Sequence, residues 1–318
     1  MSTERAAPEP DGPPGGSGNG DRVLAGIDAG GSSTRALAVA GGRVVFAGRG
    51  GPGNPLAAGQ DALTASYLTA LAGCPDPAAV AACVSGAGGA RERGQIADLL
   101  ADRFPGASIQ VVPDYAGAIL AAPDGTDVVV IAGTGSVVCS PAGGGRYHVS
   151  GGRGWILGDR GGAARLGQAA LEWYCADRAT DPEVTAQVRD CLGQTDWRGI
   201  VAALAVSPNP AALLASAAPV LTAAAEGGAD WATTRLAAEM SALAAVTCRH
   251  IERHLSPAGQ VRVALTGGVW ASPAARAAFS HALAAPGSPS RARITILPDP
   301  LDPLDGAIRL AGLVSQPD

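Results

Sequence analysis

A glycine-rich turn that follows a short apolar strand occurs twice in this chain, and each time two further short strands follow it. The first copy reads VLAGID, AGGSST, RALAVA and RVVFAG within 23–48, and the second reads DVVVIA, GTGS, VVCSPA and RYHVSG within 127–151. An ungapped alignment of the two copies pairs Gly30 with Gly133. Two similar three-stranded meanders predict two domains of similar construction. Chance matching of small residues in a glycine-rich chain is the alternative interpretation.

The segments between and after the meanders alternate between helix and strand patterns. The helix candidates are 61–72, 91–103, 163–178, 231–255 and 305–314, and the strand candidates are 79–86, a strand that ends in VVPD at 111–114, 261–268 and 293–298. This alternation is typical of sheets covered by helices. It predicts an α/β fold in two halves, with a ligand in the cleft between them.

The length of 318 residues is sufficient for two domains of ordinary size. Apolar residues make up 47% of the chain and charged residues 16%, which is typical of globular proteins. Residues 1–21 are an exception, because proline, glycine, serine and acidic residues dominate there without an apolar run. We expect this segment to be a disordered tail rather than a signal peptide.

Charge and cysteine usage restrict the partners and the compartment. A net charge of -5 makes nucleic acid an unfavourable partner. The longest uncharged stretch, 199–225, is rich in alanine and interrupted by prolines, so we expect no membrane span. Six cysteines are scattered singly, which is typical of reduced thiols in a cytoplasmic protein.

All 23 basic residues are arginines, and the chain has no lysine. This absence excludes the lysine of a Walker-A loop, the lysine of protein kinases, and Schiff-base chemistry. A chain of this composition that binds a nucleotide must therefore hold its phosphates by other groups.

The two glycine turns contain such groups. Glycine lets successive backbone N–H groups approach an anion, and serine and threonine hydroxyls add further donors. Two such turns facing each other would hold a polyphosphate. The candidate phosphate-binding residues are Gly30, Gly31, Ser32, Ser33, Thr34, Gly133, Thr134, Gly135 and Ser136. Asp28 ends the first strand and is a candidate ligand for Mg²⁺, with a turn-capping carboxylate as the alternative.

Three further segments carry candidate site residues, each with a structural alternative. Asp114 ends a strand before a helix of small residues, where it would act as a general base for a hydroxyl or as a helix cap. In GGRGWILGDRGG, Asp159 and Trp155 would contact a sugar, or else cap a helix and fill the core. In LTGGVW, Gly267 and Gly268 would let a flat base lie on the backbone, or else form only an ordinary turn, because a glycine pair at a strand end is common.

His250 and His254 lie one helical turn apart in RHIERHL. The order HxExH and the lack of an evident third ligand favour an exposed helix surface over a metal site.

Eight segments in this order resemble one family. They are GIDAGGSSTRALAV, GPGNP, VSGAGG, PDYAGAILAA, IAGTGS, GGRGWILGDRGG, LTGGVW and PLDGAIRLA. Together they resemble the N-acetylglucosamine kinase and BadF/BadG/BcrA/BcrD ATPase family, within the actin, sugar kinase and Hsp70 superfamily. The resemblance extends from Arg22 to Leu313.

The resemblance implies two ribonuclease-H-like domains in an actin-like ATPase fold, each a mixed sheet with flanking helices, around a nucleotide cleft. Their implied ranges are 22–116 and 117–304, and a connector helix at 305–318 packs back toward the first domain. By the same resemblance, ATP and Mg²⁺ are the cofactors and Asp114 matches the catalytic base. Residues 266–270 match the adenosine segment, and Asn54, Ser85 and Asp159 match sugar contacts.

The chain departs from the family pattern beside the implied sugar pocket. Where sugar kinases of this group usually read GGWGxxLGDEGS, this chain has Arg153, Arg160 and Gly162 in place of tryptophan, glutamate and serine. Because arginine binds carboxylates and phosphates through two parallel hydrogen bonds, an anionic or modified sugar becomes a candidate acceptor.

The leading functional hypothesis is an ATP-dependent kinase for an amino sugar or related hexose, active as a cytoplasmic homodimer. One alternative is an ATPase that activates a dehydratase or reductase, whose relatives share an iron-sulfur cluster between subunits. No suitably close cysteine pair is present for such a cluster. The other alternative is a non-catalytic sugar or nucleotide sensor, suggested by the two unexpected arginines.

Overall fold

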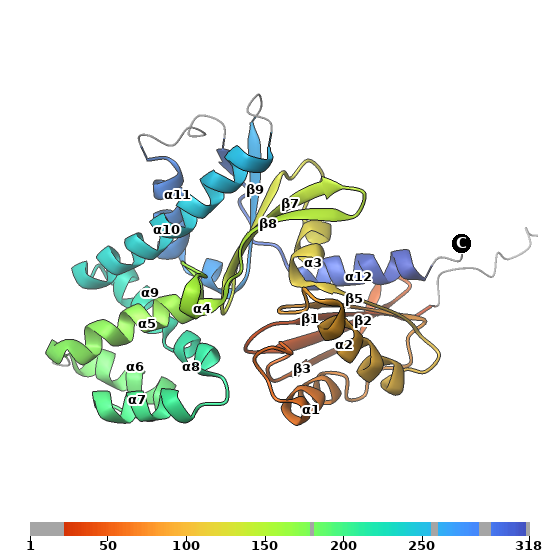
Figure 1. The fold of residues 1–318 in the computed structure, drawn as a ribbon, viewed down its shortest axis with the longest axis horizontal. Helices are drawn as coiled ribbons and strands as arrows, with labels where there is room; N and C mark the ends of the chain where they lie inside the picture. The colour runs from red at the N-terminus through yellow and green to blue at the C-terminus, as the bar shows by residue number, and fades with distance from the viewer. Residues whose placement is uncertain (1–21, 179–180, 256–259, 286–293, 316–318) are drawn as a thin grey trace, which may run out of the picture.

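A computed structural model describes residues 22–178, 181–255, 260–285 and 294–315 of the chain. The sequence-predicted tail at 1–21 lies outside these residues. Figure 1 shows two bodies, each built around a sheet, with the helices α3 and α12 between them.

The first sheet has the strand order β3-β2-β1-β4-β5. Its strands are β1 (Leu24–Ala29), β2 (Thr34–Ala40), β3 (Arg43–Gly50), β4 (Ala79–Val84) and β5 (Ser108–Pro113). The β1–β2 and β2–β3 pairs are antiparallel, whereas β1–β4 and β4–β5 are parallel. Every residue of the apolar run AVAACV in β4 is buried, as expected for a strand that is covered on both faces.

The second sheet repeats this topology. Its order is β10-β9-β6-β7-β8, with strands β6 (Val128–Ala132), β7 (Ser136–Gly143), β8 (Arg146–Gly151), β9 (Val261–Thr266) and β10 (Ile294–Ile296). The β6–β7 and β7–β8 pairs are antiparallel, and β9 runs parallel to both β6 and β10. The two glycine turns therefore connect equivalent strand pairs, β1–β2 and β6–β7, as the repeated meander predicts.

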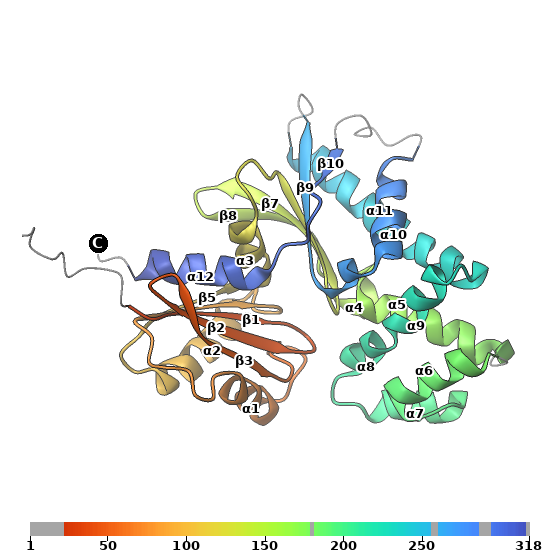
Figure 2. The same cartoon turned by 180° about the vertical axis from the view of Figure 1, so that it is seen from behind.

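The helices lie on both faces of each sheet (Figure 2). On the first sheet, α1 (Gln60–Ala70) and α2 (Ala90–Arg103) cover one face, and α12 (Pro303–Val314) covers the other. On the second sheet, α5 (Ala163–Trp173), α9 (Ala218–Glu226), α10 (Asp230–His254) and α11 (Pro273–Leu283) enclose the larger core. The helix α3 (Asp114–Ala121) packs on the opposite face of the second sheet, so it contacts both halves.

The remaining elements connect these layers. They are α4 (Gly154–Leu157), the π-helical turn η1 (Tyr174–Arg178), α6 (Pro182–Leu192), α7 (Trp197–Val206), α8 (Pro210–Ser216) and the 3₁₀ turn η2 (Gly268–Ala271). Among the described residues, no single helix has the length and apolar character to cross a bilayer. The bent pair 210–226 and 230–254 passes that test only when both helices are taken together. The division of the chain at 116 and 304 stays a prediction.

The expectation of an exposed surface around His250 is wrong. The side chain is fully buried between α10 and the second sheet, where its Nδ1 and Nε2 each lie 2.9 Å from a serine Oγ, of Ser150 and Ser140 respectively. Burial and the neighbouring His254 lower the pKa of His250 to about 4, so the ring is neutral at pH 7. Two hydroxyl partners explain how a buried imidazole is accommodated.

A seam of glycines lets α12 approach both α3 and the first sheet. A Cβ on Gly306 would overlap the carbonyl oxygen of Gly117 on α3. A Cβ on Gly26 would lie 2.9 Å from the backbone nitrogen of Ile308. At Gly306 all three nearest atoms are backbone, which cannot rotate away, and at Gly26 one backbone atom and two side-chain atoms crowd the position, so side chains are disfavoured at both.

We expect Gly306→Ala to destabilise the protein by at least about 1–3 kcal/mol, the usual cost of overpacking a core. Gly312→Ala on the same helix is the matched control, because its Cβ would meet only Leu24 Cδ1 at an ordinary 3.7 Å. Alanine is the better helix former, so the control gains up to about 1 kcal/mol. Chemical denaturation measures both, and equal stabilities would contradict the packing argument.

Candidate functional site

The two glycine turns meet at the junction of the two bodies. A Cβ on Gly31 would lie 3.2 Å from Thr134 Cβ, and the Thr134 hydroxyl donates to Ser32 Oγ at 3.3 Å. The backbone N–H groups of Gly30 and Gly133 donate within their own turns, to Ser33 and Gly135. The next N–H groups, those of residues 31–33 and 134–135, make no hydrogen bond with the described residues. Opposed turns with free donors can bind an anion without a basic side chain.

The start of α5 fixes the second turn. Ala163 N–H donates to the carbonyl of Gly133 at 2.8 Å, and Ala164 N–H donates to that of Thr134 at 3.0 Å. A Cβ on Gly162 would lie 2.7 Å from the carbonyl carbon of Gly135, so the backbones touch. Gly162, which stands where the family pattern has serine, therefore lies at a contact between two backbone segments.

The turn after β9 packs on the second glycine turn. Gly267 has φ of 106°, and a Cβ there would overlap the carbonyl of Ala132 and lie 2.9 Å from Gly133 nitrogen. Only glycine satisfies both requirements. A Cβ on Gly268 would meet no atom within 4 Å, which leaves open space at this position. This space is where the adenosine prediction falls, and the role stays a prediction.

The carboxyl ends of β3, β4 and β5 place Asn54, Ser85 and Asp114 at one edge of the first sheet. Ser85 N–H donates to the Ala29 carbonyl at 2.8 Å, and its side chain hydrogen bonds to Asp114. A Cβ on Gly86 would contact the Asn54 amide, whose Oδ1 accepts from Leu56 N–H at 2.8 Å. Segments separated by up to sixty residues in the chain are thus adjacent to the first glycine turn.

The structure does not use Asp114 as the helix cap. Pro113 occupies the N-cap position of α3, and Asp114 is the first helical residue, with its own Oδ1 accepting from Tyr115 N–H at 2.9 Å. Burial, followed by the negative charge of Asp28, raises the pKa of Asp114 to about 6. Three hydrogen bonds oppose this rise, from the Tyr115 backbone, the Ser85 side chain and the backbone of Asp114 itself. A carboxyl group with such a pKa is suited to proton transfer near neutral pH.

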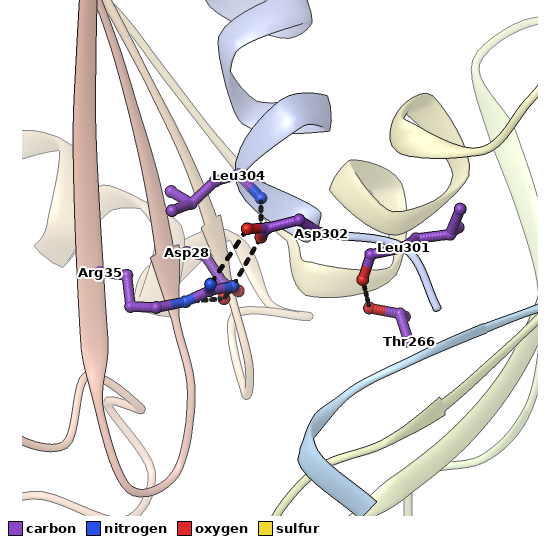
Figure 3. Close-up of polar contacts among 6 residues, drawn as sticks. All are labelled: Asp28, Arg35, Thr266, Leu301, Asp302 and Leu304. Atoms are coloured by element: carbon purple, nitrogen blue, oxygen red, sulfur yellow. Dashed lines mark hydrogen bonds and ion pairs between the residues drawn. The ribbon is translucent and has the colours of Figure 1, made fainter. Parts of the chain in front are cut away.

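Asp28 lies directly opposite Arg35 in the β1–β2 pair and forms an ion pair with it at 2.7 Å (Figure 3). Burial raises the pKa of Asp28, whereas the hydrogen bond and charge of Arg35 lower it. Its side chain keeps 20% of its surface exposed. The carboxylate is therefore paired with an arginine yet remains open to a ligand.

Asp159 lies against the second turn, and Trp155 of the same segment packs on the core of the second body. Asp159 has φ of 49°, the only positive φ outside glycine among the described residues, and its Oδ2 would overlap a Cβ on Gly135. Its Oδ1 is buried without a hydrogen-bond partner in the described part of the chain, and burial raises its pKa. Trp155 is half-buried against the second core. The four predicted sugar contacts therefore form two groups, one on each body.

Glu239 of α10, which the sequence analysis missed, holds the segment around Arg160. Glu239 is 4% exposed and accepts from Arg160 Nε at 2.8 Å, from Gly161 N–H at 3.1 Å and from Arg165 at 3.5 Å. The arginine that replaces the family glutamate is thus neutralised by a carboxylate from a distant helix. This pairing argues against Arg160 as a free binding group for an anionic acceptor. The sequence did carry a signal for this ion pair. Glu239 occupies a position on the buried face of an amphipathic helix, and a buried charge requires a partner.

Asn209 was also missed. It precedes α8 in the second body, and its Nδ2 donates to the carbonyl of Gly31 at 2.8 Å. Its Oδ1 accepts from Ala212 N–H, so one amide both caps α8 and contacts the first glycine turn.

Comparisons with known proteins support the sequence resemblance. The sequence profile of the BadF/BadG/BcrA/BcrD ATPase family matches residues 25–308. A proposed N-acetylglucosamine kinase from Chromobacterium violaceum is 26% identical, with a TM-score of 0.65 over 93% of this chain and 100% of that one. No curated protein matches the chain.

Two more distant structures show the same fold. A proposed N-acetylglucosamine kinase from Porphyromonas gingivalis is 18% identical, with a TM-score of 0.66 over 90% of this chain and 97% of that one. A ROK family glucokinase from Streptomyces griseus, solved with glucose and AMPPNP, is 17% identical, with a TM-score of 0.59 over 92% of this chain and 99% of that one. The predicted actin-like ATPase fold, with two mixed sheets and flanking helices, is confirmed.

We expect Glu239→Gln to destabilise the protein, by an amount that approaches the roughly 3–5 kcal/mol typical of breaking a buried ion pair. The 43% exposure of Arg160 should keep the loss near the lower end. Glu252→Gln is the matched control, because Glu252 is exposed on the same helix. Thermal unfolding compares the two variants, and the same melting temperature for both would contradict the role of Glu239.

Proposed function

This chain belongs to the BadF/BadG/BcrA/BcrD ATPase family, and we propose that it is an ATP-dependent kinase that phosphorylates a hydroxyl of an amino sugar or related hexose. The observation that carries the proposal is the pair of opposed glycine turns beside a carboxyl group with a raised pKa. The kinase assignment is supported by the proposed N-acetylglucosamine kinase that is 26% identical over the whole length of that protein.

In this proposal the turns bind the phosphates of ATP. The free N–H groups of residues 31–33 and 134–135 and the hydroxyls of Ser32 and Thr134 are the donors, and no lysine is required. A side chain at position 31 would fill the space between the turns, and one at position 135 would meet Asp159. Glycine at both positions therefore keeps the backbone N–H groups accessible. The open space at Gly268 would receive the adenosine.

The donor set fits a magnesium ion. Kinase sites bind Mg²⁺ through one or two carboxylates together with substrate phosphates. Asp28 is a partly exposed carboxylate, and the charges of Asp302 and Asp114 interact with it. Among the described residues, no group of three or more acidic, histidine or cysteine side chains could hold a metal alone. When bound, Mg²⁺ neutralises charge on the phosphate oxygens.

Asp114 is the proposed general base. Above pH 6 its carboxylate accepts the proton of the acceptor hydroxyl while the oxygen bonds to the γ-phosphorus. The bond between the γ-phosphorus and the bridging oxygen of ADP breaks, and ADP leaves. Ser85 and the N–H of Tyr115 orient the carboxylate through their hydrogen bonds. A positioned base contributes about 10²–10⁴-fold to such a rate.

The acceptor would lie between the two groups of predicted sugar contacts. Asn54 and Ser85 belong to the first body, and Trp155 and Asp159 to the second. The unpartnered buried Oδ1 of Asp159 is available to accept from a sugar hydroxyl. Closure of the bodies around the sugar would exclude water and limit ATP hydrolysis.

A coupled ADP-release assay over neutral, amino, N-acetylated and acidic sugars tests the proposal. Sugar-dependent ADP release on one class supports the kinase and identifies its acceptor. Sugar or nucleotide binding without ADP release would instead support a non-catalytic sensor, and iron in the purified protein would support a dehydratase activator. The cytoplasmic location and homodimeric state stay predictions.

We expect Asp114→Asn to lower kcat about 10²–10⁴-fold while nucleotide binding is retained. In the unmodified protein kcat/KM should rise with pH through about 6, because the base must be ionised. This rising limb should disappear in the variant. Full turnover in Asp114→Asn would remove Asp114 from the mechanism.

The same substitution should stabilise the protein at pH 8. Because the pKa of Asp114 is raised by folding, its protonated form favours the native state, and that stability is lost as pH rises through about 6. An uncharged asparagine avoids this loss, which is on the order of 1–3 kcal/mol. Asp98→Asn, at an exposed site on α2, is the control. A destabilised Asp114→Asn at pH 8 would indicate a structural role instead.

A further inference from the structure

The Arg35 guanidinium bridges two carboxylates that come from different parts of the chain (Figure 3). Its Nη2 lies 2.7 Å from Asp28 Oδ2 and 2.8 Å from Asp302 Oδ1. Its Nε lies 3.3 Å from Asp28 Oδ2, and its Nη1 lies 3.2 Å from Asp302 Oδ2. Each carboxylate is thus held by two N–H groups of one planar cation.

Asp302 belongs to the segment that joins the second sheet to α12. The residue before it, Leu301, donates its N–H to the Leu265 carbonyl at 2.8 Å and accepts from the Thr266 hydroxyl at 2.9 Å. Asp302 itself caps α12 by accepting from Leu304 N–H at 3.0 Å. Arg35 therefore connects the candidate metal ligand of the first sheet to the strand that leads into the Gly267 turn.

The two ion pairs differ in their exposure to water. The side chain of Asp28 is 20% exposed and that of Asp302 is 48% exposed, with Arg35 at 33%. A divalent cation at Asp28 would carry the same sign of charge as the guanidinium that already contacts its Oδ2. The cation and Arg35 would repel each other and compete for the negative charge of one carboxylate, so a cation at Asp28 weakens its pair with Arg35, and Asp302 offers the arginine a remaining partner.

We propose that Arg35 is a positioning residue that exchanges partners, leaving Asp28 when a divalent cation binds there and staying paired with Asp302. This inference rests on the proposed function, because it requires that Asp28 receive the cation of a magnesium–nucleotide complex. In the nucleotide-free protein Arg35 then neutralises Asp28. With nucleotide bound, it keeps its contact with the segment between Leu301 and α12, at the junction of the two bodies.

The test measures the melting temperature at a fixed concentration of AMPPNP while Mg²⁺ is titrated. The readout is the midpoint, which is the Mg²⁺ concentration that gives half of the maximal rise in melting temperature. In Arg35→Gln the cation has no competitor, so the midpoint should fall about tenfold. In Asp302→Asn the arginine has only Asp28, so the midpoint should rise about two- to fivefold. Asparagine retains the cap of α12. Arg49→Gln, on the neighbouring strand β3 and exposed, controls for net charge and should stay near the unmodified value.

The double variant Arg35→Gln/Asp302→Asn separates partner exchange from a general charge effect. If Arg35 exchanges partners, Asp302→Asn should have little effect once Arg35 is absent. Additive shifts in the double variant would overturn the proposal, and so would a midpoint in Arg35→Gln equal to that in Arg49→Gln. Should Arg35→Gln fail to fold, Arg35→Lys replaces it, with a lowered midpoint expected and an unchanged midpoint contradicting the proposal.

The same titration distinguishes the two levels of inference. If AMPPNP with Mg²⁺ does not stabilise the unmodified protein, the proposed function fails and the role of Arg35 fails with it. If the complex stabilises the protein but the two single variants do not shift the midpoint in opposite directions, only the role of Arg35 is refuted. Nucleotide stabilisation that does not depend on Mg²⁺ also refutes it, while leaving the kinase proposal intact.

Discussion

Close approach of backbone to backbone is the constraint on which the candidate site depends. The backbone of Gly162 touches that of Gly135, where no side chain fits, and across the junction a Cβ on Gly31 would lie 3.2 Å from Thr134 Cβ. This geometry leaves amide N–H groups as the available donors, in a chain that has no lysine to replace them. The same constraint applies at Gly267, whose φ of 106° places the turn after β9 on the second phosphate turn.

The glycine seam around α12 extends this constraint to the junction of the bodies. Because Gly306 touches α3 and Gly26 touches Ile308, the first sheet and the helix that faces the second sheet form one packed unit. The charged groups of the candidate site lie at the ends of this unit. Arg35 and Asp302 lie where the chain enters α12, and Asp114 lies where it enters α3. Packing thereby holds rigidly the elements that carry the candidate catalytic groups.

Local patterns predicted those site residues that follow directly from a strand end. Asp114 was recognisable because it stands between an apolar strand and a helix of small residues, and the glycine turns because they repeat. Glu239 and Asn209 were not found, since each acts on a segment far away in the sequence. The assignment of His250 to a surface failed for a related reason: its two serine partners come from strands a hundred residues earlier.

The sequence by itself determined the repeated three-stranded meander, the reliance on backbone donors and the position of Asp114 at the end of β5. These properties depend on periodicity, on glycine at particular turns and on the lack of lysine, all of which are local or compositional. Only the tertiary structure decided which charges are paired. It assigned Arg160 to Glu239, and Arg35 to both Asp28 and Asp302. An ion pair is a contact in space between residues whose separation along the chain is arbitrary, so no sequence pattern specifies it until the packing of helices on sheets brings the partners together.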